Sequence, residues 1–168
     1  MENEQINGGN SYIRNSSKRV LISRINKISR IRSSLKVLNT NAQSLQFKMD
    51  ELKDIVNRND IKLACITETW SKEWNEAKFE INGFDCYKKH RLDGRKGGGC
   101  MIYVNKELKS YPCREMENVQ GDDTLWCWVK ISGKDRILVG CIYRSPNSCV
   151  QNNDLIMKQI ERESELSG

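Results

Sequence analysis

The chain has 168 residues, of which 30% are charged, and its formal net charge is +6. This length suits one domain or a part of a larger one. No apolar run approaches the ~20 residues that a membrane-spanning helix requires. The start of the chain lacks the apolar segment of a secretory signal. We therefore expect an intracellular protein, nuclear or cytoplasmic rather than secreted, with no membrane partner.

The positive charge is concentrated at the start of the chain. Residues 1–36 contain eight lysines and arginines and two glutamates, so they carry the whole net charge. A basic arm of this kind can bind phosphates, and the alternative is a solvated, flexible terminus. Apolar residues at roughly helical spacing over about 18–31 leave open a short amphipathic helix that lies on a partner or on a membrane surface. We assign residues 1–33 to a basic leader and residues 34–168 to the domain itself.

The cysteines do not predict a metal centre. There are seven, none in a Cys-x-x-Cys pair, and His90 is the single histidine, so a zinc site is not expected. Four lie in apolar, strand-like runs, where cysteine behaves as a small hydrophobe: Cys65, Cys100, Cys127 and Cys141. The other three lie in more polar surroundings: Cys86, Cys113 and Cys149. Without a secretory signal, the simplest interpretation is a reduced protein.

The folded part begins with a strand–helix–strand pattern. Residues 35–39 alternate as a strand, Ser44 can cap a helix over 45–58, and residues 61–67 form the next strand. Such a unit implies a parallel strand pair with a right-handed crossover. It therefore places Asn41 and Glu68 at the same edge of the sheet.

A glycine-rich segment separates the next two strands. Residues 70–77 predict a loop with a helical turn, a short strand ends near Tyr87, and another covers 100–104. The intervening segment contains a turn signal at 93–94 and three consecutive glycines at 97–99. It lacks the spacing of a nucleotide-binding P-loop and no helix follows, so we expect a hairpin with a basic rim.

The rest of the chain predicts a second hairpin and a final helix. Residues 124–131 and 136–143 alternate as strands on either side of a turn. Asn152 or Asn153 can cap a helix over 154–166. The predicted fold class is α/β, with a mixed sheet that has a βαβ start and antiparallel hairpins.

Polar side chains follow three of the predicted strands. Glu68 ends a buried strand, where a carboxylate needs a partner; it can hold a hard cation, cap the next helix or pair with Lys72. Asn41 and Glu68 offer oxygen ligands that suit Mg²⁺, and Tyr143 offers a hydroxyl for a phosphate oxygen. Four basic side chains could add positive charge: His90, Arg91, Arg95 and Arg144. The pattern favours metal-assisted phosphoryl chemistry, although an apolar core with polar strand ends would look similar.

Four segments resemble the endonuclease/exonuclease/phosphatase domains of LINE-type (non-LTR) retrotransposons. The first is residues 38–45 (LNTNAQSL) with Lys48, and the second is residues 66–70 (ITETW) around the family's metal-binding glutamate. The third is the segment 91–99 (RLDGRKGGG), and the fourth is 143–148 (YRSPNS). The match runs in order from about residue 35 to residue 166.

The resemblance implies a four-layer α/β sandwich and a Mg²⁺- or Mn²⁺-dependent nuclease that nicks DNA, with no small-molecule cofactor. In this family the nick primes reverse transcription. By motif match, Glu68 is the metal ligand, Asn41 positions the metal or the scissile phosphate, and Tyr143 contacts the phosphate. Arg91, Arg95 and Arg144 are candidate contacts to the phosphate or to nucleic acid.

The chain departs from the family in one major respect. The later Gly-Asp-Phe-Asn-like and Ser-Asp-His-like segments, which complete the catalytic set, do not occur. His90 lies elsewhere in the chain. We therefore expect an incomplete, truncated domain that lacks its C-terminal half, is inactive or nearly so alone, and exposes apolar sheet edges. Whether it acts as an enzyme at all stays open.

Two other functions fit parts of the pattern. One is a non-enzymatic nucleic-acid-binding remnant that uses the basic leader and the rim at residues 88–96. The other is a phosphatase of the same superfamily, against which the ITETW and NAQSL segments argue.

Overall fold

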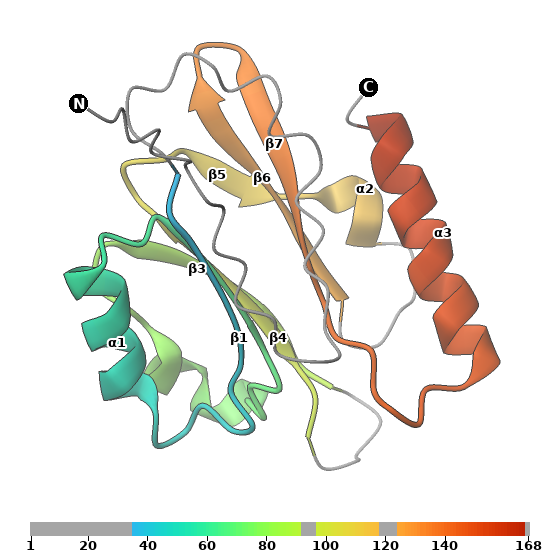
Figure 1. The fold of residues 1–168 in the computed structure, drawn as a ribbon, viewed down its shortest axis with the longest axis horizontal. Helices are drawn as coiled ribbons and strands as arrows, with labels where there is room; N and C mark the ends of the chain where they lie inside the picture. Colours follow the sequence, from blue (N-terminus) through green and yellow to red (C-terminus); the bar gives the residue numbers. More distant parts are fainter. Residues whose placement is uncertain (1–34, 92–96, 118–123, 167–168) are drawn as a thin grey trace, which may run out of the picture.

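The computed structural model describes residues 35–91, 97–117 and 124–166 (Figure 1). The predicted leader, the turn at 93–94 and Arg95 lie outside the described residues. The fold class is confirmed: the chain is a mixed α/β structure with two sheets.

The first sheet has four strands and contains the predicted parallel pair. Its order is β1 (Val37–Asn41), β2 (Leu63–Thr67), β4 (Cys100–Asn105) and β3 (Phe84–Lys89). β1 runs parallel to β2, and their register places Asn41 opposite Thr67. β4 is antiparallel to both β2 and β3. The shared edge for Asn41 and Glu68 is therefore confirmed.

The first helix, α1 (Met49–Arg58), begins later than predicted. Ser44 does not cap it, because Ser44 adopts the left-handed conformation with φ of 79° and lies in a loop. The segment before α1 stays outside the helix because the amides of Ser44 and Leu45 donate to the carbonyls of Glu68 and Thr69, just after β2. The apolar face is as predicted, with Met49, Leu52 and Val56 buried.

The second sheet contains the predicted hairpin and one further strand. Its order is β5 (Ser110–Pro112), β6 (Thr124–Ser132) and β7 (Asp135–Ile142), all antiparallel. Neither β5 nor the short helix α2 (Arg114–Glu117) was predicted. Between β2 and β3, the predicted helical turn is the 3-10 helix η2 (Glu73–Phe79).

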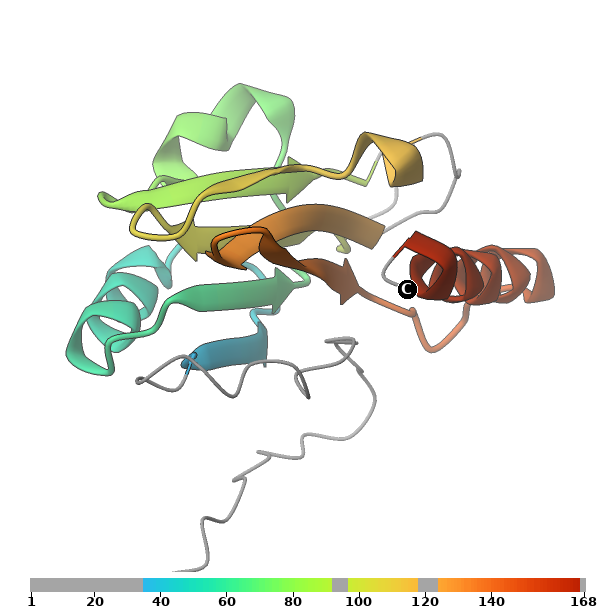
Figure 2. The same cartoon turned by 90° about the horizontal axis from the view of Figure 1, so that it is seen from above.

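The elements form four layers, seen from two directions in Figures 1 and 2. α1 and η2 cover the outer face of the first sheet, where they pack on residues of β2 and β4. The two sheets face each other through a core built from β2, β4, β6 and β7. The last helix, α3 (Val150–Leu166), covers the outer face of the second sheet.

Two expectations about the second half need correction. α3 begins at Val150, so Asn152 and Asn153 lie in its first turn instead of capping it. Cys113 is 1% exposed and packs with Trp126 and with Ile156 of α3, so it is more buried than expected, while its thiol donates to the Glu115 carboxylate at 3.3 Å. The other buried cysteines are as predicted.

The expected exposure of apolar sheet surface is not seen among the described residues, because the inner faces of the sheets cover each other. The exposed large hydrophobic side chains of the described residues are Phe47, Val150 and Met157, and none of them lies in a strand. In the same residues, no helix combines the length and apolar character needed to cross a membrane.

Candidate active site

The candidate site is built on a continuation of the parallel β1–β2 pair. Beyond the strands, the Ala42 amide donates to the Thr67 carbonyl at 2.9 Å, and the Ser44 amide donates to the Glu68 carbonyl at 2.9 Å. Asn41 is exposed, and its side-chain oxygen accepts a hydrogen bond from the Gln43 amide at 3.1 Å. The loop that carries Asn41 is thus fixed beside the residue that the sequence singled out, Glu68.

The Glu68 carboxylate is held inside the protein by donors on both sides. Its side chain is 8% exposed. Oε2 accepts hydrogen bonds from the Trp70 indole N–H at 2.6 Å and from the Gly98 amide at 3.3 Å. The N-cap of η2 is Lys72, so Glu68 does not cap the next helix. These bonds fix the direction of the carboxylate, which a metal ligand requires.

The three glycines wrap around the loop that carries Glu68. Gly98 accepts a hydrogen bond from the Trp70 amide at 3.0 Å, and Gly99 accepts one from the Thr69 amide at 3.3 Å. A Cβ on Gly97 would lie 3.2 Å from Glu68 Oε2, and one on Gly99 would lie 2.7 Å from Thr69 Oγ1. All three have positive φ, which favours glycine. The glycine run therefore shapes the site, beyond the simple hairpin that the sequence predicted.

Tyr143 reaches the same place from the second sheet. It follows β7, is 6% exposed, and belongs to the core between the sheets. Burial raises its pKa to about 12, helped by a hydrogen bond with Glu68 and by the negative charge of that carboxylate. At neutral pH the phenol keeps its proton, so it can donate a hydrogen bond to an anion.

Of the basic side chains that were predicted to add positive charge, only some lie at this site. Arg91 is 9% exposed, and its guanidinium carbon lies 6.0 Å from the centre of the Tyr143 ring. Its positive charge partly opposes the rise in the pKa of Tyr143. Arg144, by contrast, is exposed, and its Nε donates to the Asn153 side chain on α3 at 2.7 Å. Arg91 joins Glu68 and Tyr143, whereas Arg144 is turned toward α3.

The single histidine contacts the segment that follows Glu68. His90 Nδ1 is 2.8 Å from Ser71 Oγ, and Ser71 Oγ is 3.1 Å from Thr69 Oγ1. Thr69 and Ser71 are 0% and 2% exposed. This chain of hydroxyls was not predicted, and the only signal for it in the sequence is the pair of hydroxyl residues at 69 and 71.

A divalent cation is the cofactor that this set of donors would suit. The edge provides one carboxylate and one amide oxygen, and Mg²⁺ often takes few protein ligands while water and substrate phosphates complete its shell. Among the described residues, no three His, Cys, Asp or Glu side chains form a group that could hold a metal ion. The residues therefore fit a metal completed by substrate and do not fit a closed structural metal site.

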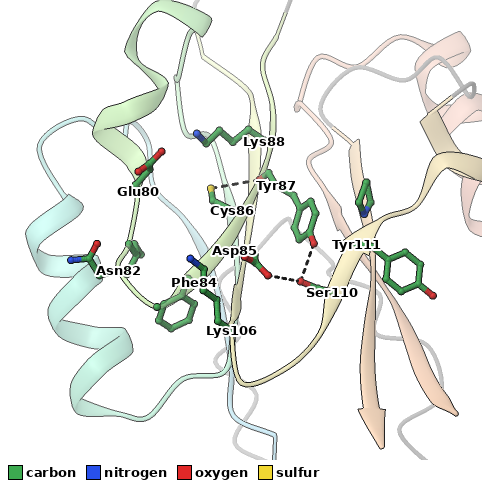
Figure 3. A pocket seen from close by; sticks show the side chains of 13 residues that line it. Glu80, Asn82, Phe84, Asp85, Cys86, Tyr87, Lys88, Lys106, Ser110 and Tyr111 are labelled. Carbon is green, nitrogen blue, oxygen red and sulfur yellow. Dashed lines mark hydrogen bonds between the residues drawn. The ribbon is translucent and has the colours of Figure 1, made fainter. Parts of the chain in front are cut away.

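Apart from the candidate site, the structure has a cavity between β3 and β5 (Figure 3). This cavity of about 550 Å³ has Lys88 and Lys106 among its lining residues. Tyr87 donates a hydrogen bond to Ser110 at 2.9 Å, and Ser110 donates one to Asp85 at 3.2 Å. It thus contains another carboxylate–hydroxyl–tyrosine group.

No protein-family model and no curated protein matches this chain in sequence. Its fold is similar to solved structures. One is the endonuclease domain of TRAS1, a telomere-specific non-LTR retrotransposon, with a TM-score of 0.58 and 14% identity over 79% of this chain and 53% of that one. Another is the AP endonuclease LMAP from Leishmania major, with a TM-score of 0.58 and 11% identity over 75% of this chain and 47% of that one.

The chain spans about half the length of each of these two solved structures. Identities of 14% and 11% establish similarity of fold and no more. The protein therefore has an endonuclease-like α/β fold, with Glu68, Tyr143 and Arg91 gathered beside the loop of Asn41.

Proposed function

We propose that the chain is the amino-terminal part of a LINE-type retrotransposon endonuclease domain, with a site for Mg²⁺- or Mn²⁺-dependent cleavage of DNA. The observation that carries this proposal is the convergence of Glu68, Tyr143 and Arg91 at the strand ends. The fold shared with two endonucleases supports it. The basic leader at residues 1–33 is proposed to add contacts to the DNA backbone.

Each residue has a chemical role in this proposal. Glu68 and Asn41 hold the metal, which when bound neutralises charge on the phosphate. Tyr143 contacts a phosphate oxygen, and this contact redirects its one O–H from Glu68, to which it is bonded in the free protein. Arg91 adds positive charge next to Tyr143. These are interactions with the phosphodiester, and none of them activates the attacking water.

The proposed site lacks the groups that the family uses to activate water. The sequence does not contain the family's later Asp and His segments. General acid–base catalysis typically contributes ~10²–10⁴-fold to a rate. We therefore expect metal-dependent DNA binding by this chain, and little or no cleavage.

The test measures DNA binding with and without the metal. A labelled DNA duplex is titrated with the full chain in EDTA or in Mn²⁺, for the wild type, Glu68→Gln and the control Asp85→Asn. The metal should tighten binding of the wild type and of Asp85→Asn but not of Glu68→Gln, because only Glu68 lies at the strand ends. An equal response of all three proteins would refute the metal site.

A cleavage assay with supercoiled plasmid and Mg²⁺ completes the test. The expected result is no nicking above background. Robust nicking that Glu68→Gln abolishes would contradict the expected inactivity while supporting the metal site. The alternative function, a non-enzymatic nucleic-acid binder, would be supported by a different result. In that case the affinity for DNA would not depend on the metal or on Glu68 and would fall steeply with salt.

A further inference from the structure

Phe47 is the most exposed large hydrophobic side chain of the described residues, at 91%. Burying such a ring typically stabilises the folded state by about 1.5–3 kcal/mol, and an exposed ring does not make this contribution. Single exposed apolar residues are common on protein surfaces. What separates Phe47 from an ordinary case is the way its loop is fixed.

The loop that carries Phe47 is anchored on both sides of the ring. Before it, Leu45 is 2% exposed, and its amide donates to the Thr69 carbonyl at 3.0 Å. After it, Met49 is 7% exposed and begins α1. The Lys48 amide also donates to the Leu45 carbonyl at 3.0 Å, which closes the turn. Phe47 therefore cannot fold onto the core unless these buried anchors are released.

The anchors also tie the loop of Phe47 to the loop that carries Glu68. Leu45 is bonded to Thr69, the residue that follows Glu68, and Phe47 is two residues further along. The same loop begins at Asn41. An exposed aromatic residue thus lies on a loop that is bonded to the loop of Glu68, at the sheet edge where the proposed function places the phosphate backbone. The bases of a bound strand lie next to that backbone and have faces that an aromatic ring can stack on.

We infer that Phe47 is a substrate-binding residue that stacks on an unpaired base beside the phosphate held by the Glu68 site. The inference rests on the proposed function and adds the part of the substrate that the loop contacts. It implies a preference for single strands or for duplexes with an unpaired base, since bases in an intact duplex offer no open face.

The test compares binding of a fluorescein-labelled single-stranded oligonucleotide by four forms of the full chain. These are the wild type, Phe47→Ala, Phe47→Trp and Met157→Ala. Met157 is a matched control because it is an apolar side chain, 54% exposed, on α3. The large exposed fraction of Phe47 means that Phe47→Ala should leave the melting temperature unchanged, which is measured first.

We expect Phe47→Ala to weaken binding about 5- to 150-fold, because stacking on a base contributes about 1–3 kcal/mol. Phe47→Trp should retain wild-type affinity, and Met157→Ala should not change it. The dependence of affinity on salt should have the same slope in the wild type and in Phe47→Ala, since no charge is removed.

Two results would overturn the inference alone. One is equal affinity of the wild type and Phe47→Ala, and the other is a loss in Phe47→Ala that Phe47→Trp fails to restore. A wild-type chain that binds neither the single strand nor a duplex would overturn the inference together with the proposed function.

Discussion

The strand-end site and the cavity between β3 and β5 contain the same chemical groups in different surroundings. The first has Glu68, Tyr143 and buried hydroxyls, and the second has Asp85, Tyr87 and Ser110 (Figure 3). Glu68 and Tyr143 are 8% and 6% exposed, whereas the second group is only partly buried. The types of residue are therefore not what distinguishes the candidate site from the cavity. The candidate site differs in its burial and in the fixed backbone groups that donate to its side chains.

The backbone supports the two regions to different degrees. At the strand ends, two loops and the glycine run bond to one another, so the polar side chains have fixed directions. In the cavity, the three side chains bond to one another across two edge strands. Water can replace those bonds, which makes the cavity tolerant of substitution. Three predictions test this difference.

The largest expected effect comes from Gly99→Ala. The new Cβ would lie 2.7 Å from Thr69 Oγ1 at a residue whose φ is +82°. Strain and displacement of Thr69 together should lower the free energy of unfolding by about 2–4 kcal/mol. Gly83→Ala is the control, since Gly83 has φ of +83° and nothing within 4 Å of the added carbon. It should cost about 1–2 kcal/mol. Urea unfolding measures both, and equal losses would show that the contact with Thr69 is unimportant.

Ser71→Ala should have the next largest effect. Ser71 is 2% exposed, and its hydroxyl lies within hydrogen-bonding distance of His90 and of the buried Thr69 hydroxyl, so its removal takes one bond from each of them. A loss of about 1–3 kcal/mol in unfolding free energy is expected. Ser110→Ala removes a hydroxyl from the cavity, where water replaces it, and should cost less than about 1 kcal/mol. A larger loss for Ser110→Ala would reverse the contrast between the two regions.

The smallest expected effect is a change in alkaline stability for Tyr143→Phe. The folded-state pKa of Tyr143 is about 12, above its ordinary value of 10. The contribution of its raised pKa is therefore complete below pH 10 and is lost as the pH rises from 10 to 12. Over that interval the stability advantage of the wild type over Tyr143→Phe should fall by about 1–2 kcal/mol.

The alkaline experiment is done in EDTA, with denaturant unfolding at several pH values. Tyr87→Phe is the matched variant from the cavity, because the pKa of Tyr87 is also raised by burial but is opposed by its bond to Ser110. The difference in unfolding free energy between the wild type and Tyr87→Phe should change less with pH. If the difference in unfolding free energy between the wild type and Tyr143→Phe did not change with pH, the strong burial of that phenol would be contradicted.

Several parts of the fold could be predicted because local pattern decides them. The alternation of residues 124–131 and 136–143 predicted the β6–β7 hairpin, and the strand–helix–strand pattern predicted the parallel pair of β1 and β2. The start of α1 was predicted wrongly for a physical reason. The sequence predicted helix from residue 45, but hydrogen bonds from the Ser44 and Leu45 amides to the Glu68 loop hold the start of this segment in another conformation.

The sequence by itself determined the order of the strands' apolar runs, the shared edge of Asn41 and Glu68, and the glycines that can adopt positive φ. Only the tertiary structure decided that those glycines enclose Glu68, that Arg91 and Tyr143 join it, and that Arg144 does not. The reason is sequence distance. Gly98 bonds to a carboxylate 30 residues away, and no local pattern encodes such a contact. Packing of the two sheets brings the remaining groups to one edge.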